Sequence, residues 1–191
     1  MFIKKIAILF SGNGSNLENI LQKVHNRVFN GIKIECALLI CNKKDAFGIE
    51  RAKKFGLETM IIENNKFQNR EEFDKKLVEV IKKANVDLVI LAGFMRILTP
   101  IFTNRIKAIN LHPSILPLFK GANAIKESFE SGMMLGGVSV HYVSEELDGG
   151  KLIKQRAFER TRDMSLDEWE EQIHKIEHEL LSEAIIEILC G

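Results

Sequence analysis

Apolar runs of strand length recur along the chain and are separated by stretches with helical spacing. The runs are Ile3–Phe10, Ile34–Cys41, Thr59–Ile62, Asp87–Ala92 and Ala108–Leu111. Strands that alternate with helices form a mostly parallel sheet that helices cover on both faces. The pattern therefore predicts an α/β fold.

Two segments have the pattern of helices that pack one side on a core. From Arg70 to Ala84, apolar residues recur at i, i+4, i+7 and i+8, and charged residues fill the other face. A longer final helix is expected from Ser165 to about Leu189. It opens with Ser165-x-x-Glu168, which has the form of a capping box.

The pattern changes after Gly136. Residues 138–142 alternate between apolar and polar, a turn follows at Asp148-Gly149-Gly150, and the segment from Lys151 to Phe158 is again extended. This predicts an antiparallel pair of strands. Because 191 residues suit one core, we predict a single-domain, three-layer, Rossmann-like open sheet, mostly parallel, with an antiparallel pair at its C-terminal edge.

Charge and cysteine usage exclude several classes of protein. The chain has 27 Lys and Arg against 26 Asp and Glu, so we expect no capture of nucleic acid or of an anionic membrane surface. Its apolar start is too short to span a bilayer and lacks a cleavage site. Cys36, Cys41 and Cys190 form no CxxC pair, which suits a reducing compartment, and we expect a cytoplasmic protein. Strand alternation predicts that Cys36 and Cys41 face opposite sides of the sheet and share no metal.

A glycine-rich segment, Ser11-Gly12-Asn13-Gly14-Ser15-Asn16, follows the first strand and precedes a helix expected to begin near Leu17. Glycines allow a sharp turn, and the unpaired N–H groups of a helix start attract anions. We therefore predict a phosphate site, the alternative being a tight turn alone. NAD binding is not expected, because Leu17 stands where the dinucleotide motif needs glycine, and the second strand ends in Cys41-Asn42-Lys43-Lys44 instead of an acid for the ribose.

A second candidate is Asn110-Leu111-His112-Pro113-Ser114, at the end of a predicted strand. Residues two apart in a strand project to the same face, and Pro113 keeps His112 extended. An amide and a protonated imidazole aimed together could both donate to the oxyanion formed when a formyl carbon is attacked. The alternative is that His112 is a buried structural residue.

Two further segments are ambiguous by themselves. Asp148, in Glu145-Glu146-Leu147-Asp148-Gly149-Gly150, could hold His112 in its charged form and accept a proton through water, but Asp-Gly-Gly is also an ordinary turn signal. The segment from Leu91 to Leu98 could form a slot for a flat heterocycle or belong to the core. Solvent or packing roles are expected for the other histidines, which are His25, His141, His174 and His178.

Taken together, these four segments resemble the phosphoribosylglycinamide formyltransferases, folate-dependent enzymes of purine synthesis, from about Ile3 to Glu187. The Asn-x-His-Pro and Asp-Gly-Gly motifs also mark the wider formyl-folate family. The resemblance implies transfer of the formyl group of 10-formyltetrahydrofolate to the amine of glycinamide ribonucleotide, which gives formylglycinamide ribonucleotide and tetrahydrofolate. It implies these two small molecules as partners, no metal, and a monomer or homodimer.

The resemblance also implies residue roles. The catalytic residues that it implies are Asn110, His112 and Asp148. Gly14, Ser15 and Asn16 hold the acceptor phosphate, with Glu177 on the same substrate. The residues implied for the folate site are Arg70, Met95, Arg96, Ile97, Leu98 and Asn110. Residues 1–105 are expected to bind the acceptor phosphate, and residues 106–191 the folate and the catalytic groups, within one domain spanning 1–191.

The sequence departs from its relatives in one loop and leaves rival functions open. At Lys120-Gly121-Ala122-Asn123-Ala124, relatives often carry a Pro-Gly pair and further basic or histidine residues. The rivals within the family are a methionyl-tRNA formyltransferase, expected to add a basic domain, and a formyltetrahydrofolate hydrolase, expected to add a regulatory domain. A rival of another class is a non-catalytic nucleotide-binding module that uses only the glycine loop.

Overall fold

The strands form one mixed sheet at the centre of the molecule. The computed structural model describes residues 2–191, and Met1 lies outside them. The strands are β1 (Phe2–Phe10), β2 (Arg27–Phe29), β3 (Ile32–Cys41), β4 (Met60–Ile61), β5 (Leu88–Leu91), β6 (Ala108–His112), β7 (Leu135–Tyr142) and β8 (Leu152–Glu159). Their order is β2-β3-β1-β5-β6-β7-β8, with β4 beside the end of β3. Four pairs are parallel, namely β4 with β3, β3 with β1, β1 with β5, and β5 with β6. The other three pairs, β2 with β3, β6 with β7, and β7 with β8, are antiparallel.

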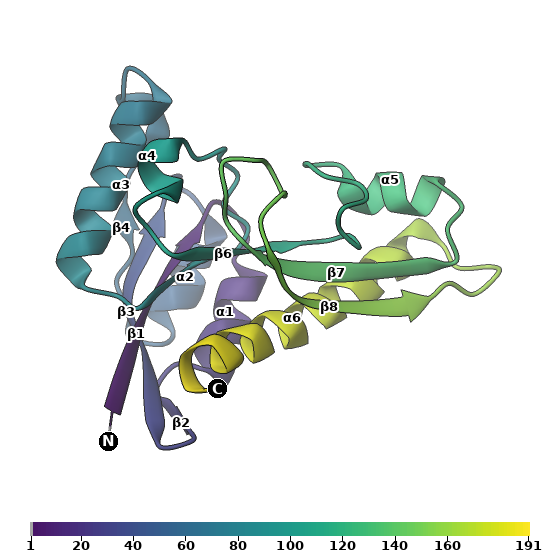
Figure 1. Cartoon of the computed structure of the whole chain (residues 1–191), viewed down its shortest axis with the longest axis horizontal. Coiled ribbons are helices and arrows are strands. Elements are labelled where there is room, and N and C mark those ends of the chain that lie inside the picture. Colours follow the sequence, from purple (N-terminus) through teal and green to yellow (C-terminus); the bar gives the residue numbers. More distant parts are fainter. Residues whose placement is uncertain (1) are drawn as a thin grey trace.

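Helices cover both faces of this sheet (Figure 1). They are α1 (Ser15–Lys23), α2 (Phe47–Lys53), the 3-10 helix η1 (Asn64–Lys66), α3 (Arg70–Ala84), α4 (Pro100–Thr103), α5 (Ala124–Glu130) and α6 (Leu166–Cys190). The buried residues of α1, α2 and α6 join one core cluster, and those of α3 and α4 join another. The predicted three-layer α/β fold with its antiparallel edge pair is confirmed.

The two cores follow from strand alternation. In β1, Ile6, Ile8 and Phe10 lie in the first core, whereas Ala7 and Leu9 lie in the second. Residues of a strand that is buried on both faces must all be apolar, which explains the continuous run along β1. The same reasoning explains the run in β5, in which all four residues are buried.

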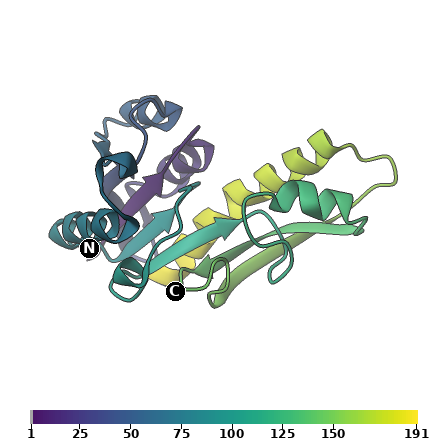
Figure 2. The ribbon, with the colours of Figure 1, turned by 90° about the horizontal axis from the view of Figure 1, so that it is seen from above.

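The final helix ties the antiparallel hairpin to the rest of the molecule. It runs along β7 and β8 to end near α1, and α5 lies beside it (Figures 1 and 2). Trp169 of α6 is fully buried, with the rings of Phe158 and Phe129 centred 4.8 and 6.0 Å away. The predicted capping box is present, because the Ser165 side chain and Glu168 each accept the other's backbone N–H.

One prediction about β3 is wrong. Cys36 and Cys41 lie in the same core cluster and not on opposite faces. The pairing of β1 with β3 passes from Ile6–Cys36 to Ala7–Leu38, so Ala37 is an extra residue in β3. Such a bulge shifts the alternation by one position. Both thiols are free and buried, and burial raises the pKa of each.

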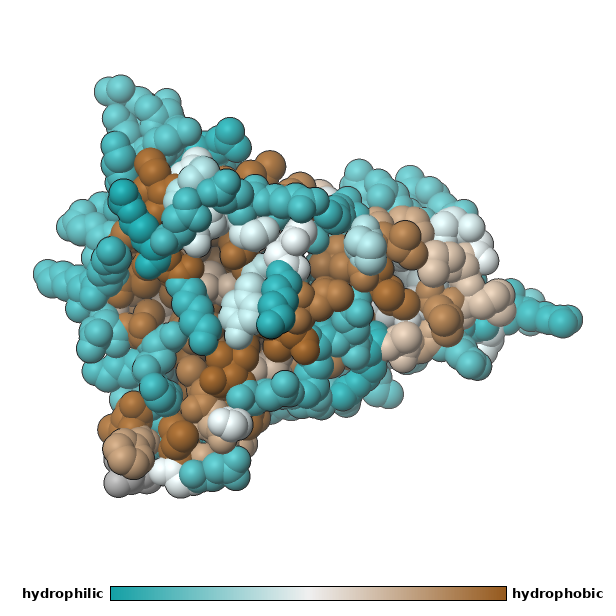
Figure 3. Space-filling model, viewed as in Figure 1, coloured by the Kyte–Doolittle hydropathy of each residue, from teal (hydrophilic) through white to brown (hydrophobic). Residues whose placement is uncertain are grey.

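The surface shown in Figure 3 is mostly hydrophilic, with apolar areas in its middle and at the lower left. The lower-left area lies over the start of β1 and over β2, where Phe2, Ile3 and Val28 are exposed. None of the helices described between residues 2 and 191 is both long enough and apolar enough to cross a bilayer.

Candidate active site

A cavity of about 430 Å³ lies at the carboxyl end of β5 and β6, where ligands of open α/β sheets bind. Three loops and three strands, β5, β6 and β7, enclose it. Its lining residues are Leu91, Gly93–Leu98, Asn110–Pro113, Gly121, Ala122, His141 and Val143–Asp148. Three candidate segments that are distant in sequence therefore meet at one place.

Strand β6 and the β7–β8 loop bring three polar side chains together in this cavity. The distance from His112 Nδ1 to Asp148 Oδ2 is 3.3 Å, and that from Asn110 Nδ2 to Asp148 Oδ1 is 3.4 Å. His112 is 4% exposed and Asp148 9% exposed. The carboxylate thus lies between an amide and an imidazole, largely out of water.

The backbone around Asp148 explains why its carboxylate points inward. Asp148 has a φ of 50°, a left-handed conformation that Asp tolerates better than most residues. A side chain at Gly150 would place its Cβ 1.7 Å from Tyr142 O, so only glycine fits there. The turn is therefore specified by residue type and not only by length.

Several groups act on the ionisation of Asp148. Burial has the largest effect on its pKa and would raise it. Attraction to His141, the N–H of Gly121 at 2.9 Å and the charge of His112 together outweigh burial, and the pKa is held below its ordinary value. Asp148 is therefore ionised at neutral pH.

Phe119, which directly precedes the loop that departs from relatives, contacts His112. His112 Nε2 lies 2.7 Å from Phe119 O, while Nδ1 faces Asp148. Both neighbouring oxygens are hydrogen-bond acceptors. Next along the loop, Lys120 forms an ion pair with Glu146 at 2.6 Å, and the N–H of Gly121 donates to Asp148.

His141 belongs to this cluster, although we expected a solvent or packing role. It is 2% exposed, and its Nε2 lies 3.3 Å from Asn110 Nδ2 and 3.6 Å from Asp148 Oδ1. Its Nδ1 lies 2.9 Å from Tyr142 O. The signal that reveals it is the register of the hairpin, in which His141 is the direct partner of Asn110.

Four of the residues implied for the folate site, Met95 to Leu98, line the cavity as one continuous segment. The segment is held at its start by Ser11, whose Oγ accepts from Met95 N at 2.8 Å. It is held at its end by buried Asp74, which accepts from the N–H and the hydroxyl of Thr99 at 2.6 and 2.7 Å. Arg70 is exposed at the start of α3 and does not line the cavity, so its role stays a prediction.

The glycine loop adjoins this cavity through Ser11. Helix α1 begins at Ser15, two residues before the expected start, and Gly14 precedes it with a φ of 77°. A Cβ on Gly14 would lie 2.6 Å from Gly48 Cα, so α1 and α2 approach closely here. No side chain caps α1, and its first N–H groups are available to an anion.

The last helix brings Glu177 to the glycine loop, 161 residues away from Asn16 in sequence. Glu177 is 6% exposed, and its Oε2 accepts from Asn16 Nδ2 at 3.4 Å and faces His174 Nδ1 at 2.8 Å. Asn16 Oδ1 is buried without a partner among residues 2–191. Because buried acceptors usually have a donor, this oxygen is available to a donor group of a bound molecule.

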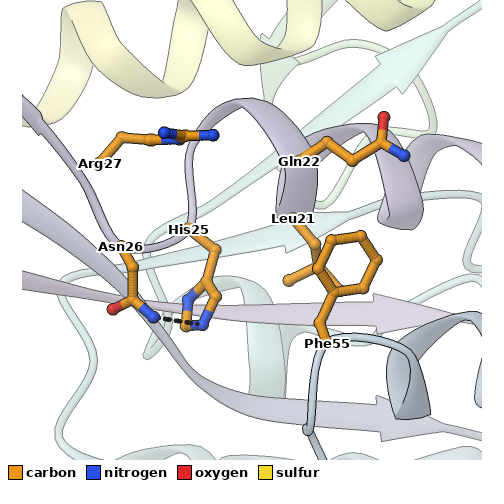
Figure 4. Close-up of a pocket in the computed structure, with 6 residues that line it drawn as sticks. All are labelled: Leu21, Gln22, His25, Asn26, Arg27 and Phe55. Atoms are coloured by element: carbon orange, nitrogen blue, oxygen red, sulfur yellow. Dashed lines mark hydrogen bonds between the residues drawn. The ribbon is translucent and has the colours of Figure 1, made fainter.

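Another hollow lies at the far end of α1, lined by Leu21, Gln22, His25, Asn26, Arg27 and Phe55. His25 lies beside Asn26, as Figure 4 shows, and its Nδ1 accepts from the N–H of Cys36 at 2.9 Å. Burial lowers the pKa of His25, which favours this acceptor role. His25 therefore has a structural role, as expected. Within the described part of the chain, no group of three His, Cys, Asp or Glu side chains could hold a metal ion.

Comparisons with known proteins agree with this geometry. The model of the formyl transferase family matches residues 4–185. A Bacillus subtilis protein named phosphoribosylglycinamide formyltransferase is 35% identical over 98% of this chain and 95% of its own length. The trifunctional purine biosynthetic protein adenosine-3 of Drosophila melanogaster is 36% identical over 98% of this chain, which spans only 14% of that longer protein.

A solved structure gives the same result in three dimensions. The crystal structure of phosphoribosylglycinamide formyltransferase from Campylobacter jejuni is 61% identical to this chain, with a TM-score of 0.96 and 98% of both chains covered. Sequence and fold agree along nearly the whole chain. The chain therefore belongs to the formyl transferase family.

Proposed function

We propose that this chain transfers the formyl group of 10-formyltetrahydrofolate to the amine of glycinamide ribonucleotide, giving formylglycinamide ribonucleotide and tetrahydrofolate in purine biosynthesis. The observation that carries the proposal is that Asn110, His112 and Asp148 meet in a cavity beside a glycine loop able to bind phosphate. The names of the relatives support the same substrates.

The folate would occupy the cavity. Its mouth carries three exposed apolar side chains, with Met95 69%, Ile97 53% and Leu147 48% exposed. Exposed apolar side chains around a cavity favour a flat heterocycle, which would cover them. Backbone groups of the 95–98 segment and the Asn110 amide supply polar contacts. Arg70 is assigned to the folate site on the resemblance alone.

The ribotide would bind at the glycine loop. The N–H groups of Gly14, Ser15 and Asn16 and the positive end of α1 would hold its phosphate, and Glu177 would accept from its hydroxyl groups. Ser11 links the two binding regions, because its N–H donates to Gly93 O at 3.1 Å and its Oγ accepts from Met95 N. The amine and the formyl carbon would thus meet near Asp148, and the reaction becomes effectively intramolecular.

Chemistry would proceed without a covalent enzyme intermediate. The neutral amine attacks the formyl carbon, a C–N bond forms, and the carbonyl electrons move onto oxygen. Asn110 Nδ2 and protonated His112 donate to this oxyanion, which is the charge that pre-oriented donors stabilise best. Asp148 accepts the amine proton through water, the bond to the folate nitrogen breaks, and that nitrogen takes up a proton.

The structure imposes one condition on this scheme. His112 Nε2 is hydrogen-bonded to Phe119 O. Donation to the oxyanion therefore requires the loop around Phe119 to shift or to share that proton. We further propose a cytoplasmic monomer or homodimer that needs no metal, since an amine and two oriented donors suffice for the step.

A spectroscopic assay of tetrahydrofolate release tests the proposal. The purified protein is given 10-formyltetrahydrofolate with glycinamide ribonucleotide, with water alone, or with methionyl-tRNA. Release that depends on the ribotide is expected. Release without an acceptor would indicate the hydrolase, release only with charged tRNA the translation enzyme, and no release a binding module.

A further inference from the structure

His174 is the charged neighbour of Glu177 that the proposed reaction does not use. Its Nδ1 lies 2.8 Å from Glu177 Oε2, and its Nε2 lies 3.3 Å from Glu170 Oε1. Carboxylate oxygens only accept hydrogen bonds, so both ring nitrogens must carry a proton to satisfy both contacts. His174 therefore sits as an imidazolium between two acidic side chains of α6.

We infer that His174 is a positioning residue for the acceptor: it fixes the Glu177 carboxylate beside the glycine loop so that Oε1 faces the ribotide. This rests on the proposed function and assigns a residue that controls acceptor binding. Glu177 Oε2 is already used by His174 and Asn16. Oε1 makes no hydrogen bond to any described residue and is the oxygen left for a ligand hydroxyl.

Burial makes this partner necessary. The Glu177 side chain is 8% exposed, whereas that of His174 is 47% exposed. A buried carboxylate without a charged partner is costly and tends to move or to take up a proton. His174 meets this need from the solvent side, where it can exchange protons freely. Acceptor binding would therefore respond to pH through His174.

The direction of the response follows from the neighbours. The hydrogen bond with Glu177 has the largest effect and raises the pKa of His174 above its ordinary value; burial opposes it, and Glu170 adds to it. Other charged or titratable groups near this part of α6 are His178 on α6, Lys23 and Glu18 on α1, and Arg51 on α2. As pH rises through the raised pKa, Glu177 loses its charged partner, and the acceptor KM should rise.

The test compares three variants with the wild type. His174→Ala removes both donors and should raise the acceptor KM about tenfold, equivalent to about 1.4 kcal/mol, while kcat and the folate KM stay within about twofold. His174→Asn keeps one neutral donor where Nδ1 lies. Lys175→Ala, exposed on the same turn, is the matched control and should behave as the wild type.

The pH profile separates positioning from a structural role. The ratio of the acceptor KM of His174→Asn to that of the wild type cancels ionisations of the substrates. The ratio should be several-fold at about pH 6 and should fall towards one by about pH 9, as the wild-type imidazole becomes neutral. A ratio near one throughout, or a loss of kcat and thermal stability in His174→Ala with unchanged acceptor KM, would overturn the inference.

Failure of the proposed function would look different. In that case the wild type itself would release no tetrahydrofolate with the ribotide. Calorimetric binding of ribose 5-phosphate then makes the same comparison without turnover. Weaker binding to His174→Ala than to Lys175→Ala supports the inference, and equal binding refutes it.

Discussion

Replacing Asp148 with asparagine tests the centre of the proposed site with little change of shape. The introduced amide would keep one acceptor oxygen for the Gly121 N–H but would lack the negative charge that lies 3.3 Å from His112 Nδ1. At that distance and an effective dielectric constant of about 20, the lost attraction is at most about 5 kcal/mol. Losing a proton acceptor typically costs about 100- to 10,000-fold in rate, or about 3 to 5 kcal/mol.

Steady-state kinetics and ligand binding then separate chemistry from binding. We expect Asp148→Asn to lower kcat by at least about 100-fold, while both KM values change by less than about threefold, because the carboxylate acts mainly in the transition state. Asp163→Asn makes the same charge change at an exposed position and should be normal. A folded Asp148→Asn enzyme with kcat within about threefold of wild type would refute the proposed role.

The contribution of Asp148 to the free energy of unfolding should depend on pH, and the same variant can measure it. Because the pKa of Asp148 is lowered in the folded state, its ionised form stabilises the fold above the pKa of the unfolded chain. This contribution is lost as pH falls through the folded pKa. We expect urea titration to give a difference in unfolding free energy between wild type and Asp148→Asn that is constant near neutral pH. This difference should shrink towards zero at acidic pH. A gap that widened on acidification would contradict the sign.

Three other predictions follow from the geometry. Asn110→Ala should lower kcat about 100-fold in the release assay, because one oxyanion donor is lost, and a near-normal rate would remove that role. Gly150→Ala should unfold at a lower temperature in calorimetry, since its Cβ would meet Tyr142 O, and an unchanged melting temperature would show that the turn can adapt. Ser165→Ala should cost about 1 kcal/mol of stability with unchanged kcat, whereas altered kinetics would mean that the cap also orders the site.

Sequence patterns predicted the elements whose burial is continuous or periodic. The bounds of α3 match the expected helix from Arg70 to Ala84, and the hairpin and the capping box are confirmed. Short elements such as β2, α2 and α5 were missed, because three to seven residues contain too little periodicity to identify. The bulge at Ala37 was missed because it depends on the pairing with β1 and not on local composition.

Only part of the candidate site could be predicted from local sequence patterns. The placement of Asn110 beside His112 follows from strand alternation, and the Asp-Gly-Gly turn suggested Asp148 as their neighbour. His141 depends on the register of β7 against β6, which no single-strand pattern reveals. The role of Glu177 was implied only by the family resemblance, because no local pattern links this residue to Asn16, 161 residues away in the sequence.

The arrangement of the strands brings the two proposed binding regions together with few residues. β1 and β5 are parallel neighbours, so the glycine loop after β1 and the 93–98 segment after β5 begin side by side at one sheet edge. Ser11 fixes their separation through two hydrogen bonds to Gly93 and Met95. β6, the next strand, places Asn110 and His112 at the same edge. The distance between the two proposed ligand sites is therefore set by the rigid spacing of neighbouring strands, which is the pre-orientation that a two-substrate transfer needs.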